Sequence, residues 1–229
     1  MESNEEMRKR YLEIWEQRRR PPSITANWVD NEWARGRTQY LVFLVRVQHR
    51  QVVREVIKLQ EKLARFPCID TFPPEYLHLT VKETGCFLVE KRVYEDDLIE
   101  EDLKNLVSEA EDILSHYAPF RASLQYINSF IETLCIEVYD NGLIREINGD
   151  LLKVRGIRKL KHDYPLFLPH LSIAQFKNQQ NYSELMEYLE ANRDLKITDI
   201  QIDTVELVKV ILPKEDGLPK PITMHTFRL

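Results

Sequence analysis

The sequence predicts an α+β fold that is built as two similar halves. From Gln39 onward, segments with strand character and segments with helical periodicity follow one another, with helices placed between pairs of strands. Each half also contains a strand, a helix and then a second strand that carries a His-x-Ser/Thr motif, at His78 and at His170. This faint repeat indicates an internal duplication.

Composition limits the class of protein. With 229 residues, 43% hydrophobic and 30% charged, the chain is typical of a globular domain or of two fused lobes. The longest apolar run, Tyr40 to Val45, is too short to cross a bilayer, and charges stand where a signal peptide needs an apolar segment. We therefore expect a cytoplasmic protein with no membrane partner. A net charge of −5 argues against a protein that binds nucleic acid over its whole surface.

The cysteines do not suggest a metal centre. Cys68, Cys86 and Cys135 are odd in number and lack the short spacings of a zinc site. Reduced thiols are expected, with no metal and no cofactor.

The first 38 residues form a region of their own, and residues 39–229 form the main domain. Residues 4–20 place Met7, Tyr11 and Ile14 at helical spacing, and two prolines follow. The arginines at 18–20 are interpreted as a solvated helix end. The segment 21–38, which holds Trp28 and Trp33, is predicted to be an irregular linker that packs on the main domain.

The main domain is predicted to alternate strands and helices. Strands are expected at 39–47, around His78, at 120–127, at 131–139, around His170, at 200–212 and at 222–229. Helices are expected at 52–66, 97–117, 141–154 and 182–191, where apolar residues recur every three or four positions and Pro67 and Pro119 mark two ends. A tight connection at Asn128-Ser129 is expected to join the strands on either side of it.

The two motif strands combine polar and apolar faces. Because side chains alternate along a strand, His78, Thr80, Lys82 and Thr84 are expected on one face, and His170, Ser172, Ala174 and Phe176 on one face of the other strand. If the halves meet face to face, two imidazoles and two hydroxyls converge in one cleft.

This set of groups suits phosphodiester cleavage without a metal. One neutral imidazole can accept a proton from the attacking oxygen, and a charged imidazole can protonate the leaving oxygen. Thr80 and Ser172 have no base beside them in the sequence, so we interpret them as donors to phosphoryl oxygens. The alternative is a pair of core histidines that hydrogen-bond to neighbouring hydroxyls.

The motifs His78-Leu79-Thr80-Val81 and His170-Leu171-Ser172-Ile173, together with the element order, resemble the two-histidine phosphoesterase superfamily, which includes 2′-5′ RNA ligase-like proteins and cyclic nucleotide phosphodiesterases. The resemblance covers residues 39–229. It implies a bilobal, pseudo-twofold fold with two antiparallel sheets facing a cleft and helices outside. It also implies metal-independent cleavage of 2′,3′-cyclic or 2′-5′ phosphodiesters, with His78 and His170 as the acid–base pair and Thr80 and Ser172 as phosphate ligands.

Two departures from the family pattern concern the substrate. Glu83-Thr84 replaces an apolar pair, and Gln175 stands where many members have arginine. Lys82 is expected either to neutralise a phosphate or to be solvated at a strand end. Phe176 is expected either to stack on a base or to pack in the core. The basic loop 155–162 either holds outer phosphates or is solvated.

Three functions remain open at this level. The first is a monomeric hydrolase that acts on a nucleotide or an RNA end. The second is a nucleotide sensor of the same fold that does not turn its ligand over. The third is a relative that contacts other proteins through its N-terminal helix.

Overall fold

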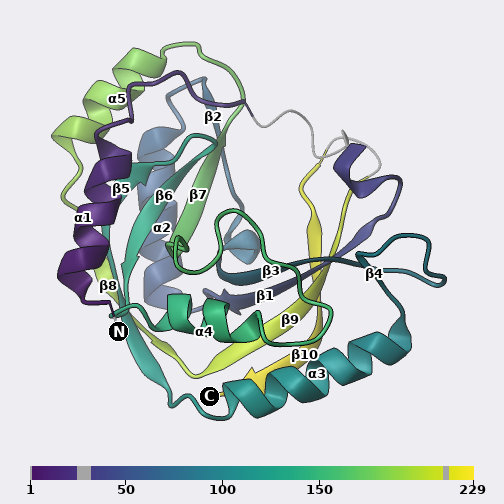
Figure 1. Cartoon of the computed structure of the whole chain (residues 1–229). Helices are drawn as coiled ribbons and strands as arrows, with labels where there is room; N and C mark the ends of the chain where they lie inside the picture. The colour runs from purple at the N-terminus through teal and green to yellow at the C-terminus, as the bar shows by residue number, and fades with distance from the viewer. Residues whose placement is uncertain (1, 25–31, 214–216) are drawn as a thin grey trace.

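The computed structural model of the chain describes residues 2–24, 32–213 and 217–229 (Figure 1). Its strands within these ranges form a 10-stranded sheet with the order β10-β9-β1-β3-β7-β6-β5-β8, in which β2 pairs with β7 and β4 with β3. The strands are β1 (Gln39–Arg46), β2 (Ile69–Thr71), β3 (His78–Leu88), β4 (Asp97–Leu98), β5 (Phe120–Ser129), β6 (Thr133–Tyr139), β7 (His170–Phe176), β8 (Lys196–Ile202), β9 (Thr204–Ile211) and β10 (Lys220–Arg228). The helices are α1 (Asn4–Trp15), α2 (Arg50–Leu63), α3 (Glu100–Leu114), α4 (Leu143–Leu151) and α5 (Tyr182–Ala191), with short 3₁₀ turns at Glu32–Ala34 and Pro74–Tyr76.

The α+β fold with two similar halves is confirmed. Counted outward from the centre, β3-β1-β9-β10 forms the first half and β7-β6-β5-β8 the second. The unit β1-α2-β3 corresponds to β6-α4-β7, and each unit ends in a motif strand. The two expected sheets are joined edge to edge, because β3 and β7 pair antiparallel at Leu79 and Leu171. The result is one continuous curved sheet.

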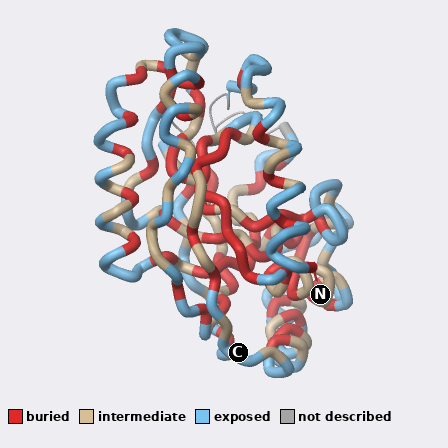
Figure 2. Tube along the Cα trace, turned by 90° about the vertical axis from the view of Figure 1, so that its left-hand side faces the viewer, coloured by how far each residue is buried: buried red, intermediate tan, exposed pale blue. Residues whose placement is uncertain are grey.

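The helices tie the halves together. Helix α2 follows a first-half strand but packs on β7 and β8, and α4 follows a second-half strand but packs on β3. The apolar stripe of α2, including Val52, Val56 and Leu63, is fully buried in a core shared by both halves. In Figure 2 the buried chain runs through the middle of the molecule, and exposed stretches lie toward the outside. Each motif strand is therefore supported from behind by a helix from the other half of the repeat.

Two sequence predictions about the strands were wrong. The expected strand 200–212 is two strands, β8 and β9, which lie in different halves of the sheet. The expected turn at Asn128-Ser129 lies inside β5, and the connection is at 130–132. Asn128 is fully buried, and its amide donates to Glu137 Oε1 at 2.8 Å and to the Tyr11 carbonyl at 3.0 Å. These tertiary hydrogen bonds outweigh the turn preference of asparagine.

The N-terminal region contains the expected helix. Helix α1 starts with a Ser3–Glu6 capping box, and Met7 and Tyr11 are fully buried against β5 and β6. It ends at Trp15, short of the predicted Arg20. Trp33 of the linker packs edge-on against Tyr40, with 5.3 Å between ring centroids. Trp28 lies outside the described residues. No helix in the described ranges is long and apolar enough to span a membrane.

Candidate active site

The two motifs lie on the two central strands of the sheet. Leu79 and Leu171 are opposite each other and fully buried on the core face. Because the strands are antiparallel, the neighbouring positions bring His78 toward Ser172 and Thr80 toward His170. All four polar side chains are partly buried on the opposite face. The structure thus brings the four predicted site residues together on one surface.

Each motif strand carries a β-bulge at the residue that follows its His-x-Ser/Thr triplet. In β3, Phe43 pairs with Lys82 and the next residue, Leu44, pairs with Thr80, so Val81 is an extra residue. In β7, Leu134 pairs with Ala174 and Cys135 with Ser172, so Ile173 is the extra residue. An extra residue reverses the alternation of side chains beyond it.

The bulge in β3 places Lys82 in the core, so the prediction that it lies on the cleft face was wrong. Its side chain is fully buried, and Nζ donates to Asp163 Oδ2 at 2.6 Å, to the Glu83 carbonyl at 2.5 Å and to the Arg158 carbonyl at 3.0 Å. Burial lowers the pKa of Lys82, although the Asp163 carboxylate opposes this. Lys82 attaches the loop that precedes β7 to strand β3.

The bulge in β7 has the same effect on Phe176. This residue is fully buried and packs edge-on against Tyr182. Of the two alternatives for Phe176, core packing is therefore the one that the structure shows, and the prediction of a base-stacking ring was wrong. Glu83 and Gln175 take the positions that alternation would have given to Lys82 and Phe176, and both are partly buried. Of the residues that depart from the family pattern, Glu83 lines the groove described below, whereas Thr84 is fully buried.

A buried amide side chain holds each bulge. Asn148 of α4 donates from Nδ2 to the carbonyl of Val81 at 2.8 Å. Gln60 of α2 donates from Nε2 to the carbonyl of Ile173 at 2.9 Å. Both amides are buried, and both come from the helix that packs behind the bulged strand. Because buried carbonyls need a partner, these amides stabilise the backbone geometry that aims the motifs.

The two histidines are oriented in the same way. Nδ1 of His78 lies 2.6 Å from the Tyr76 carbonyl, and Nδ1 of His170 lies 3.0 Å from the Leu168 carbonyl. A carbonyl oxygen only accepts hydrogen bonds, so Nδ1 carries the hydrogen in both rings. Nε2 is then the atom that exchanges protons with a substrate. The carbonyl is two residues before the histidine in both motifs, as the pseudo-twofold repeat requires.

The surroundings of both imidazoles favour the neutral form. Burial lowers the pKa of His78, and Arg46, its partner on β1, adds to this effect. Burial also lowers the pKa of His170, and the charges of His78 and His162 act in the same direction. In each case the backbone carbonyl at Nδ1 opposes the shift, because it stabilises the charged ring.

A groove opens beside His78 on the first half of the sheet. Its volume is about 360 Å³, and its lining residues come from the linker, β1, β3, β9, β10 and the loops at 76 and 160: Trp33, Tyr40, Val42, Leu44, Tyr76, His78, Thr80, Glu83, Leu160, Val210, Leu212, Pro219 and Pro221. The volume is within the range of small-ligand sites. Sequence reasoning did not assign a role to Tyr40, Tyr76 or Glu83. Of these three residues, only Glu83 was marked in the sequence, because it departs from the family pattern.

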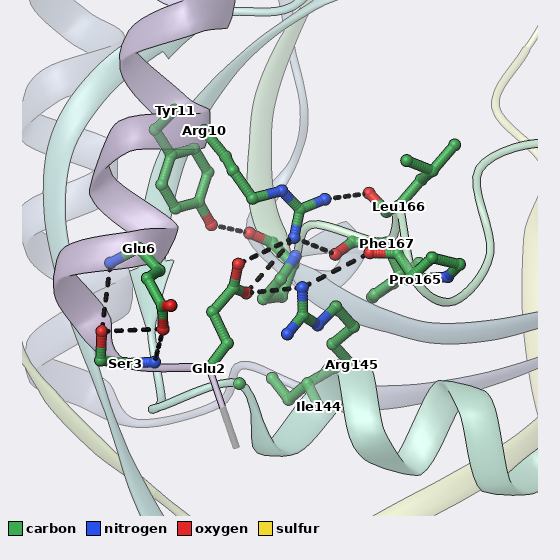
Figure 3. A network of polar contacts seen from close by, with 12 residues as sticks. Glu2, Ser3, Glu6, Arg10, Tyr11, Ile144, Arg145, Pro165, Leu166 and Phe167 are labelled. Carbon is green, nitrogen blue, oxygen red and sulfur yellow. Dashed lines mark hydrogen bonds and ion pairs between the residues drawn. The ribbon is translucent and has the colours of Figure 1, made fainter.

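Helix α1 covers the corresponding surface of the second half. The Tyr11 hydroxyl accepts from the Val138 amide at 3.1 Å, and its one hydrogen is shared between the Val138 carbonyl at 3.0 Å and the Pro169 carbonyl next to His170. Figure 3 shows Glu2 between Arg10 and Arg145, while Arg10 also contacts the carbonyls of the chain that leads into β7. The first-half groove is the pocket that contains His78 and Thr80, and a second pocket of similar volume at the end of α1 includes Phe130, whose ring centroid lies 4.6 Å from that of His170.

The basic loop 155–162 contributes little positive charge to this groove. Leu160 is its lining residue. Arg155 pairs with Glu109 at 2.7 Å, and Arg158 lies 3.8 Å from Glu95. No group of three or more His, Cys, Asp or Glu side chains in the described part of the chain is arranged to hold a metal ion.

Comparison with known proteins agrees with this geometry. Residues 64–210, which include both motifs, match the family model of the 2′-5′ RNA ligase superfamily. The chain belongs to the 2′-5′ RNA ligase superfamily. The two-histidine phosphoesterase resemblance is therefore confirmed, and phosphoesterase chemistry is the activity of this class. A curated relative, the RNA 2′,3′-cyclic phosphodiesterase of Methanocaldococcus jannaschii, is 26% identical over 169 residues, which are 70% of this chain and 86% of the relative.

Several solved structures share the fold. The protein TT0787 of Thermus thermophilus aligns with a TM-score of 0.58 at 21% identity, over 83% of this chain and 97% of its own. Escherichia coli LigT without ligand aligns with a TM-score of 0.54 at 13% identity, over 84% and 98%. The same LigT bound to 3′-AMP aligns with a TM-score of 0.53 at 13% identity, over 85% and 99%.

Proposed function

We propose that this protein is a metal-independent phosphodiesterase that opens the 2′,3′-cyclic phosphate of a nucleotide or of an RNA end. The observation that carries the proposal is the matched pair of imidazoles on adjacent strands. Each ring has Nδ1 bound to its own backbone, which leaves Nε2 for proton exchange on the shared face. The name of the archaeal relative supports the cyclic phosphate as substrate.

The reaction requires one neutral and one protonated imidazole. The neutral Nε2 takes a proton from water while the water oxygen forms a bond to phosphorus. The bond from phosphorus to one ribose oxygen breaks, and the protonated imidazole gives its proton to that leaving oxygen. Thr80 and Ser172, one beside each imidazole, donate hydrogen bonds to the non-bridging oxygens, where negative charge increases. The product is a phosphomonoester, and the histidine pair ends with the opposite protonation. A 2′-5′ phosphodiester would be cleaved by the same groups.

A second candidate is a nucleotide sensor without turnover. Burial lowers the pKa of both histidines, so both rings are mainly neutral near pH 7 in the free protein. Two neutral imidazoles suit binding better than acid catalysis.

A turnover assay with EDTA present separates the two candidates. Its substrates are 2′,3′-cyclic mononucleotides and 2′-5′ and 3′-5′ dinucleotides. The enzyme hypothesis predicts turnover that survives chelation and falls by on the order of 10²–10⁴ in His78→Ala or His170→Ala, while mononucleotide binding persists. Loss of both together should cost little more than either alone, because the pair acts as a unit. Binding without turnover in the wild type, or near-wild-type rates in either variant, would contradict the enzyme hypothesis.

A further inference from the structure

The end of the first-half groove that is remote from the histidine pair contains an acidic group. Glu83 lies in this groove on the same strand as His78 and Thr80, three residues beyond Thr80. Across the bulge, Glu83 and Thr80 pair with Val42 and Leu44 of β1, which are two strand positions or about 7 Å apart. His78 pairs with Arg46, which is four positions or about 13 Å from Val42, and the reach of a nucleotide from its ribose phosphate to the far edge of its base lies between these two distances. Among the described lining residues, Glu83 is the one acidic side chain, and the others are aromatic, aliphatic or neutral polar apart from His78 itself.

The carboxylate limits what can occupy this end of the groove. It repels phosphates, so neither a polyphosphate tail nor the next phosphate of an RNA chain is accommodated there. It is an acceptor with room for about four hydrogen bonds, and the Tyr40 hydroxyl supplies one of them to Oε2 at 3.3 Å. The group opposite Glu83 must therefore be uncharged or cationic and must present N–H or O–H donors.

The aromatic side chains of the groove fit a planar ring. Tyr76 stands at the histidine end, with 5.5 Å between its ring centroid and that of His78. Tyr40 and Trp33 pack on each other beside Glu83 and line the other end. Aromatic rings of this kind stack on bases without selecting among them. Base selection therefore falls to Glu83.

We infer that this groove selects guanine, with the Glu83 carboxylate accepting hydrogen bonds from N1–H and the N2 amino group of the base. The inference rests on the proposed function, since it places the cyclic phosphate at the histidine pair. Guanine is the one common base whose Watson–Crick edge has two neighbouring donors. Adenine and cytosine place a ring-nitrogen acceptor beside their amino donor, and uracil places carbonyl oxygens on both sides of its single N–H. Each of these arrangements sets an acceptor against a carboxylate oxygen, which accepts hydrogen bonds but cannot donate one.

The substrate side of the test compares the 2′,3′-cyclic phosphates of guanosine, adenosine, cytidine, uridine and inosine with the wild-type chain. We expect kcat/KM for the guanosine compound to exceed that of the other three common nucleotides by about ten- to a hundred-fold, the range of a bidentate base contact. Inosine, which keeps N1–H and lacks the N2 amino group, should fall in between. Equal rates for all bases, or a preference for another base, would overturn the inference and leave the proposed function intact.

The protein side of the test uses Glu83→Gln, which is isosteric and keeps an oxygen for Tyr40. A Gln amide offers a donor beside an acceptor, which matches the edges of adenine and cytosine. We expect the guanosine preference to disappear, with the adenosine and cytidine rates unchanged or higher. Glu61→Gln, an exposed position on α2, should keep the wild-type preference. An unaltered guanosine preference in Glu83→Gln would show that another group reads the base.

A binding measurement makes the result independent of turnover. Calorimetry with 3′-GMP, 3′-AMP, 3′-CMP and 3′-UMP should show the same order of affinities in the wild type and the same loss of selectivity in Glu83→Gln. If no cyclic nucleotide is turned over but 3′-GMP still binds selectively through Glu83, the proposed hydrolysis fails and the guanine site remains. If the four nucleotides bind equally, the guanine site is refuted whatever the rates.

Discussion

Replacing Lys82 by Met tests the conclusion that this lysine belongs to the core. The two charged side chains, Lys82 and Asp163, are both fully buried with 2.6 Å between Nζ and Oδ2. Met has a similar length and removes the charge, so the variant leaves Asp163 with the Leu160 amide at 2.5 Å and Asn148 Nδ2 at 3.1 Å as its donors. The carbonyls of Glu83 and Arg158 lose their donor as well.

The expected loss is large. An unpaired buried charge costs about 3–5 kcal/mol in the free energy of unfolding. For a chain of this size that corresponds to a decrease of roughly 6–20 °C in Tm. Lys82→Met combined with Asp163→Asn should recover part of the loss, because the double variant no longer buries an unpaired charge.

The assay is urea unfolding followed by circular dichroism, and the chain contains a matched control. Lys177 and Asp70 form an ion pair with the same 2.6 Å separation, but their side chains are 43% and 53% exposed. Lys177→Met should therefore cost about 0–1 kcal/mol. If Lys82→Met unfolds with the same free energy as Lys177→Met, Lys82 is not held as a buried charge and the reasoning fails.

Two further predictions concern catalysis. Because burial lowers the pKa of both histidines, kcat/KM should follow a bell-shaped pH profile with its optimum below about 6.5, the ordinary value for histidine. The unfolded state then binds protons more readily than the folded state, so these histidines lower stability as the pH falls. A profile of kcat/KM that increases through pH 8 would contradict these shifts. Thr80→Val and Ser172→Ala should each reduce kcat by less than the histidine substitutions, since one hydroxyl remains in each variant. A loss in either that equals the loss in His78→Ala would show that the hydroxyl does more than donate to phosphate.

The sequence was sufficient for the fold class and for predicting that the four motif residues share one surface. Strand alternation depends on local backbone geometry, so His78 with Thr80, and His170 with Ser172, could be assigned to shared faces from spacing alone. The match between the two half-chains then indicated that the faces converge. Most helices were placed correctly because their apolar stripes and terminal prolines are local signals.

Only the tertiary structure decided on which face the side chains after each bulge lie. Simple alternation places Lys82 and Phe176 on the motif face, and both are buried on the other side because Val81 and Ile173 are extra residues in their strands. Residues close in sequence do not reveal such a bulge, since its carbonyls are held by Asn148 and Gln60, which come from distant helices. The position of α1 was equally out of reach, because its buried face shows that it packs on something without showing where. The sequence by itself therefore predicted that His78 and His170 lie on one face of neighbouring elements, and long-range packing decided that Glu83 faces the groove and that Lys82 does not.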